Sequence, residues 1–138
     1  MANYRNHETP GLQDFGELVL RSDQGHGYVR VDWYTPDGLP TWGDGRLMIL
    51  GTEGYIELRK YVDIAGRAGT NHLFVVNADA PRHIDCSGQP LPYYSQLLHD
   101  IEHRTETAMA QAHCFKVMEL ALQAQDQAVD LRLRHGDR

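Results

Sequence analysis

The hydrophobic period of the chain changes once, near Ser87, and this change constrains the fold more than any other feature. Before Ser87, several short runs alternate apolar with polar residues, which is typical of half-buried strands. After it, apolar residues recur at i, i+3, i+4 and i+7, which is typical of amphipathic helices. Strands followed by helices predict an α+β domain, with an open antiparallel sheet of about five to six strands and two C-terminal helices packed on one face.

The clearest hairpin lies within residues 36–61. Residues 47–50 form a short apolar run, residues 51–54 read Gly-Thr-Glu-Gly, and residues 55–61 alternate apolar with polar side chains. Glycine permits the backbone conformations that a compact reversal needs, so two glycines three apart predict the turn of this hairpin. The remaining strands are predicted over residues 15–21, 28–34, 72–77 and 82–86.

Two helices are predicted after Ser87. The first begins near Pro92, because proline suits the first turn of a helix. The second runs from about Thr107, a residue type favoured as N-cap, to about Leu133. Small and apolar residues are expected to form the buried stripe of this second helix: Ala110, Cys114, Val117, Ala121, Ala124, Ala128 and Leu131.

Length and composition predict one globular domain over residues 1–138, with residues 1–13 as a polar loop or leader. A net charge of -6 disfavours nucleic acid, because phosphate binding needs a basic surface. Cys86 and Cys114 have no CxxC spacing, so neither a disulfide framework nor a four-cysteine zinc site is expected. No apolar run reaches the roughly 18 residues of a membrane span. We therefore expect a cytoplasmic protein with no membrane partner.

The predicted sheet face that points away from the helices has an unusual composition. Tyrosines are interleaved there with residues of both charges: Tyr28, Arg30, Asp32, Tyr34, Tyr55, Glu57, Arg59 and Tyr61. Tyrosine and arginine are enriched at protein interfaces. We therefore favour a subunit or domain interface on this face, and the alternative is a solvated face, which antiparallel sheets tolerate.

Two local motifs suggest chemistry but have simpler interpretations. His99, Glu102 and His103 match H-x-x-E-H, the zinc-binding order of inverted zincin peptidases. No third ligand follows, so surface histidines are favoured and no metal site is predicted. His113 and Cys114 are adjacent, and neighbours on a helix diverge by about 100 degrees, which disfavours a nucleophile and base pair. No catalytic set, glycine fingerprint or Walker sequence is recognised.

The loop at residues 40–46 is the remaining place where polar and aromatic groups converge. Trp42, Asp44 and Arg46 offer an indole, a carboxylate and a guanidinium between glycines. Such a set suits a polyhydroxylated ligand through stacking and bidentate hydrogen bonds. The alternative is a structural ion pair between Asp44 and Arg46, with Trp42 at the sheet edge.

The order of these features resembles the C-terminal domain of the Gfo/Idh/MocA oxidoreductases. The residues that resemble the family are Arg46-Leu-Met-Ile-Leu-Gly-Thr-Glu-Gly-Tyr-Ile-Glu-Leu, then Asp100-Ile-Glu-His-Arg-Thr, then Ala112-His-Cys-Phe-Lys-Val-Met-Glu-Leu-Ala-Leu-Gln-Ala-Gln-Asp-Gln-Ala. The resemblance implies that full-length relatives carry an NAD(P)-binding Rossmann domain, which is missing here. It also implies an Asp-x-x-x-His pair on a helix, and the only such spacing, Asp79 to His83, contains Pro81 and lies in a predicted strand.

What the resemblance implies is therefore a domain that binds no cofactor and has no catalytic residue of its own. Its partners would be the missing Rossmann domain and a second copy of the chain, which would meet through the open sheet face. In the full-length enzyme, NAD or NADP would oxidise the CH-OH group of a sugar or polyol. Candidate substrate contacts are Trp42, Asp44, Arg46 and His72. The alternative function is a stand-alone binding or scaffold module that uses the same exposed face.

Overall fold

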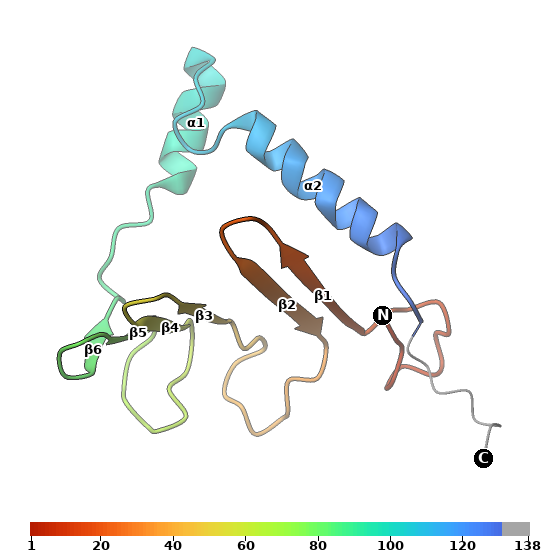
Figure 1. Cartoon of the computed structure of the whole chain (residues 1–138), viewed down its shortest axis with the longest axis horizontal. Helices are drawn as coiled ribbons and strands as arrows, with labels where there is room; N and C mark the ends of the chain where they lie inside the picture. Colours follow the sequence, from red (N-terminus) through yellow and green to blue (C-terminus); the bar gives the residue numbers. More distant parts are fainter. Residues whose placement is uncertain (131–138) are drawn as a thin grey trace. The chain divides into compact units, whose positions relative to one another are not determined.

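The computed structural model describes residues 1–130, which divide between two compact units. The first unit comprises residues 1–34 and 92–130, and the second comprises Thr35–Leu91 (Figure 1). Six antiparallel strands in open sheets precede two C-terminal helices, so the predicted α+β class is confirmed. The strands are distributed over a two-stranded and a four-stranded sheet. Neither described helix has the length and apolarity to cross a membrane.

In the first unit, β1 (Phe15–Arg21) and β2 (His26–Asp32) form an antiparallel hairpin. Successive side chains of a strand point to opposite faces. One face of this hairpin is therefore apolar, and the other carries Glu17, Tyr28, Arg30 and Asp32. The predicted alternation over residues 28–32 is confirmed. Strand β2 begins and ends two residues earlier than expected, so the predicted strand residues Trp33 and Tyr34 lie beyond it.

In the second unit, β3 (Arg46–Leu50), β4 (Tyr55–Arg59), β5 (His72–Val76) and β6 (Arg82–Asp85) form a meander in sequence order. The register places only apolar side chains on one face of the two pairings that join β3, β4 and β5: Leu47, Ile49, Ile56, Leu58, Leu73 and Val75. The opposite face of the sheet carries charged and aromatic residues from all four strands. These are Arg46, Tyr55, Glu57, Arg59, His72, Phe74, His83 and Asp85.

The turn between β3 and β4 depends on Gly54. A Cβ atom at this position would lie 2.1 Å from the carbonyl oxygen of Val76 on β5. The Gly51 amide donates to the Gly54 carbonyl oxygen at 2.8 Å, which closes the predicted turn. The absence of a side chain at Gly54 thus allows the hairpin to approach the third strand of its sheet.

The helices begin and end differently from the sequence prediction. Helix α1 (Tyr93–His103) starts after Pro92, as predicted. Helix α2 (Gln111–Asp126) starts after Ala110, so the predicted N-cap at Thr107 is wrong. Its expected end near Leu133, with Leu131 of the stripe, lies outside the described residues.

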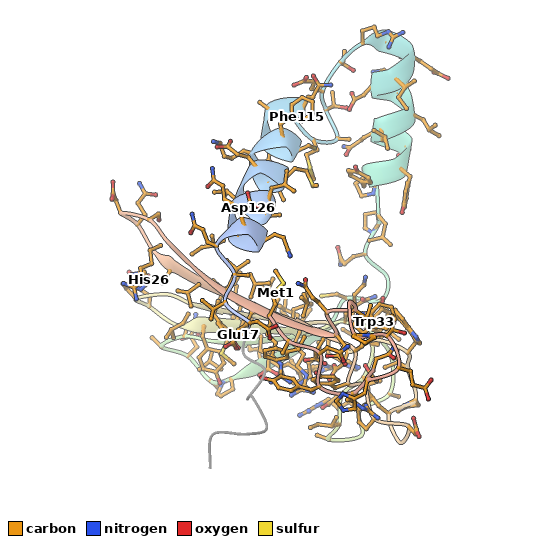
Figure 2. The ribbon with its side chains drawn as sticks, turned by 90° about the vertical axis from the view of Figure 1, so that its right-hand side faces the viewer. Met1, Glu17, His26, Trp33, Phe115 and Asp126 are labelled. Carbon is orange, nitrogen blue, oxygen red and sulfur yellow. The ribbon has the colours of Figure 1, made fainter. Side chains whose placement is uncertain are left out.

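The predicted buried stripe of α2 is also wrong for the described residues. None of the residues of α2 is buried, and of the predicted stripe up to Ala128 only Ala124 is half-buried. The helix runs alongside the β1–β2 hairpin, and its Asp126 end lies nearer to Met1 and Glu17 than its Phe115 end does (Figure 2). The Met1 amino group donates to the Val129 carbonyl oxygen at 2.8 Å. The helix thus flanks the hairpin without burying its own apolar residues.

Candidate functional site

The Trp42–Arg46 loop precedes β3 in the second unit and has one very exposed aromatic residue. Trp42 is 85% exposed. The Asp44 carboxylate accepts hydrogen bonds from Nε (2.8 Å) and Nη2 of Arg46, and this contact raises the pKa of Arg46. Asp44 and Arg46 therefore bind each other here, which is the structural alternative considered for this loop. Their role as ligand contacts stays a prediction.

A row of alternating charges crosses β3 and β4 beside this loop. Arg46 and Arg59 are directly opposite in the strand register, and like charges in that position repel. Each has a carboxylate two residues earlier on its own segment, and Glu57 accepts a hydrogen bond from Arg59 Nε at 2.8 Å. The Arg59 side chain is only 16% exposed, and its Nη1 is buried with no hydrogen-bond partner. Both N–H groups of this atom are therefore available to an acceptor.

His72, the fourth predicted substrate contact, is fully buried. Its Nε2 lies 3.1 Å from the Gly69 carbonyl oxygen, and its Nδ1 lies 3.0 Å from His83 Nε2. Because a carbonyl only accepts, the His72 proton belongs on Nε2, and its Nδ1 then accepts from His83 Nε2–H. His72 therefore attaches the loop before β5 to the sheet. In this conformation, the buried His72 side chain would affect a bound ligand only by positioning the loop before β5.

The polar face of the β1–β2 hairpin is held by side-chain hydrogen bonds. The Tyr28 hydroxyl donates to Glu17 at 2.9 Å, which is the main reason that the pKa of Tyr28 is raised. Arg30 donates to Asp32 at 2.7 Å and lies over the ring of Phe15. Three predicted interface residues, Tyr28, Arg30 and Asp32, are exposed and share one face. An assembly role for this face stays a prediction.

Asp14 is a buried residue that the sequence analysis did not identify. Its carboxylate accepts hydrogen bonds from the backbone amides of Tyr4, Arg5 and Asn6 and from the Tyr34 hydroxyl at 2.8 Å. Burial opposes the charge, but these four donors outweigh it and lower the pKa of Asp14 to about 2. The predicted interface residue Tyr34 is thus half-buried and structural, and its burial and bond to Asp14 raise its pKa to about 12.

Asp100 organises the connection between the helices in the same way. One oxygen accepts from the Thr105 hydroxyl (2.6 Å) and from the amide and hydroxyl of Thr107, and the other accepts from the Ala108 amide. The Thr105 hydroxyl contributes most to lowering the pKa of Asp100. Arg104, in the left-handed conformation with φ 56°, ends α1. The Asp100 to Thr105 part of the motif that resembles the family therefore holds the connection between α1 and α2 in place.

The motifs that suggested chemistry do not converge on a reacting centre. The rings of His99 and His103 are stacked 4.1 Å apart, and His103 Nδ1 donates to the His99 carbonyl oxygen. Among residues 1–130, no group of three potential ligands could hold a metal ion. Cys114 is an exposed free thiol, not the core residue expected, and Cys86 is a half-buried free thiol.

Comparison with known proteins relates the chain to part of a larger protein of the oxidoreductase class. One matching structure is from Erwinia carotovora atroseptica SCRI1043 and is described as that of a putative oxidoreductase. The two chains are 46% identical with a TM-score of 0.87, and the match covers 94% of this chain. It covers 39% of the Erwinia chain, so this chain spans well under half the length of that protein. No protein-family model and no curated protein matches the chain.

Proposed function

We propose that this chain is the substrate-side and oligomerisation domain of an NAD(P)-dependent sugar or polyol oxidoreductase of the Gfo/Idh/MocA type. The observation that carries the proposal is the 46% identity over 94% of this chain to only 39% of the Erwinia protein. The family resemblance of the β3–β4 hairpin and of both helices supports the same assignment. On this proposal the chain is inactive alone.

The described residues do not fit a nicotinamide dinucleotide. Such a cofactor binds at the glycine-rich turn of a parallel strand–helix–strand unit, where the helix N-terminus receives the pyrophosphate. All pairings in both sheets of residues 1–130 are antiparallel, and both helices follow the last strand. We therefore assign NAD or NADP to the part of the enzyme that has no counterpart in this chain, and we derive no catalytic step here.

The substrate role is proposed for the Trp42–Arg46 loop. Trp42 offers an exposed ring for stacking on a sugar, and Arg46 has one nitrogen that Asp44 does not bind. His72 would act indirectly, since its hydrogen bond to Gly69 positions the neighbouring loop. These residues would shape affinity and selectivity and leave hydride transfer to the cofactor domain.

Self-association is proposed through the polar sheet faces. The Glu17–Tyr28 and Arg30–Asp32 pairs on one hairpin, and Glu57–Arg59 on the other sheet, combine both charges with exposed aromatic rings. A face that alternates charges is complementary to a second copy of itself, as a two-fold interface requires. Light scattering should then detect an oligomer that Tyr28→Glu dissociates. A monomer at all accessible concentrations would contradict the assembly role.

A chimera tests the proposed function. The matched 39% of the Erwinia protein is replaced by this chain, and NADH and NADPH binding is followed by the fluorescence of the reduced nicotinamide. We expect the chimera to fold and bind the cofactor that the Erwinia protein binds, with similar affinity. The isolated chain should bind neither. Tight binding by the isolated chain, or a chimera that fails to fold, would refute the assignment.

The alternative function is a stand-alone binding module. The exposed aromatic and charged side chains of the polar faces, including Tyr28 and Tyr55, favour a protein partner as much as a second copy. Replacing Tyr55 and Arg59 with glutamate distinguishes the two. Loss of capture of a heterologous partner with self-association unchanged supports the module, whereas loss of self-association supports the oxidoreductase domain.

A further inference from the structure

An apolar groove lies within the first unit, between the β1–β2 hairpin and the C-terminal part of α2. Its volume is about 450 Å³. The sheet wall is built by the apolar face of the hairpin, Leu18, Leu20, Val29 and Val31, and the helix wall by Leu120 and Ala124, with Val129 beyond the helix end. In Figure 2 the groove corresponds to the region between the lower end of α2 and the strand that carries Glu17.

The two walls face each other but do not close on each other. Val31 is 64% exposed, and Leu20, Val29 and Leu120 are also exposed although they line a concave surface. Exposed apolar surface costs free energy, and an apolar patch framed by polar residues marks a site of interaction. Gln123 and Gln127 supply such polar residues along the groove. The groove therefore suits a segment with one apolar and one polar face.

The length of the matching protein offers a source for that segment. The match covers 94% of this chain, whereas most of the Erwinia chain has no counterpart here. We propose that this groove is the docking site for an amphipathic segment from the part of the oxidoreductase that this chain lacks. This inference rests on the proposed function, because that function supplies the missing polypeptide.

Cysteine labelling in the chimera tests the inference. Val31→Cys and, as a second groove variant, Leu20→Cys are introduced into a background in which Cys86 and Cys114 are serine. Ile64→Cys is the matched control, because Ile64 is 68% exposed and does not line the groove. Iodoacetamide labelling is followed at each position by peptide mass spectrometry, in the isolated chain and in the chimera.

We expect the two groove cysteines to be labelled at least about tenfold more slowly in the chimera than in the isolated chain, because burial excludes the reagent. The Ile64→Cys control should not show this difference. Equal groove labelling in a chimera that folds and binds nicotinamide would overturn the docking site and leave the proposed function standing. Failure of the chimera to fold would refute both. If labelling of the isolated chain slows as its concentration rises, a second copy fills the groove and the inference is wrong.

Discussion

Replacing Gly54 with alanine tests whether the β3–β4 turn is fixed by close packing against β5. The added Cβ would lie 2.1 Å from the Val76 carbonyl oxygen and 3.0 Å from Asn77 Cα. Both are backbone atoms of the adjoining strand and its end, so no flexible side chain can move aside. The oxygen must retreat to at least 3.0 Å, the shortest approach that real Cβ atoms make. The hairpin and β5 must therefore separate at this point.

The expected cost follows from two contributions. Overpacking a well-packed site costs about 1–3 kcal/mol. The Gly54 φ of 157° is rarely adopted by other residues, and holding alanine there costs roughly another 1–3 kcal/mol. The reduced entropy of the unfolded chain returns about 0.4–1 kcal/mol. Gly54→Ala should thus lower the free energy of unfolding by about 3 kcal/mol, or the Tm by about 10 °C.

Gly51→Ala is the control from the same turn. A Cβ at Gly51 would meet only the Gly54 carbonyl oxygen at 3.5 Å, which is an ordinary contact. This variant should be neutral or more stable by up to about 1 kcal/mol. Urea unfolding followed by circular dichroism gives both values. If the two variants differ by less than about 1 kcal/mol, the close approach of the turn to β5 does not restrict residue 54.

Further predictions concern the buried carboxylates and their donors. The pKa of Asp14 is about 2 in the folded chain against 3.8 normally, so its contribution to stability is present above about pH 4 and lost as pH falls toward 2. Asp14→Asn should flatten that acid transition in near-ultraviolet circular dichroism. Tyr34 should be the last tyrosine to ionise in absorbance at 295 nm, near pH 12, and Tyr34→Phe should abolish that step. Asp100→Asn should accelerate amide exchange at Thr107 and Ala108, in the connection between the helices, roughly tenfold or more, with exchange in α2 unchanged.

The local alternation of apolar and polar residues was sufficient to predict the strands and the two faces of the β1–β2 hairpin. The two-residue period placed Val29 and Val31 on one face and Tyr28 and Arg30 on the other, as the structure has them. This works because a strand allows only two side-chain directions. The Gly-Thr-Glu-Gly turn was predictable for a similar reason, since few residues other than glycine fit position 54.

The start of α2 was mispredicted because Thr107 is bound by a residue seven positions earlier. Threonine is a favoured N-cap when its hydroxyl accepts from an amide of its own helix. Here its hydroxyl and amide both donate to Asp100, and the helix begins three residues later, after Ala110. Helix-start rules consider only the next few residues and cannot include this acceptor. The role of Asp14 was not predicted for the same reason, because its hydrogen-bond donors lie up to 20 residues away along the chain.

The site residues show the same limit. The ion pair between Asp44 and Arg46 could be considered from the sequence, because the two residues are only two positions apart. It could not foresee that His72 is fully buried and hydrogen-bonded to His83, because that contact depends on the β5–β6 pairing. It also could not identify the unpaired Nη1 of Arg59, which depends on the burial of a single atom.

The wrong prediction of a buried stripe on α2 has a different origin, and that origin is relevant to function. The helix is apolar on more than one side: Leu120 lines the groove, whereas Phe115, Met118 and Leu122 are exposed elsewhere on its surface. A helix that is apolar around most of its circumference belongs in the interior of a protein. The periodic stripe was therefore a sound reason to expect burial, and the exposure of the helix reflects the lack of enough packing partners among the described residues. The chimera tests whether the part of the Erwinia protein that has no counterpart here supplies these packing partners.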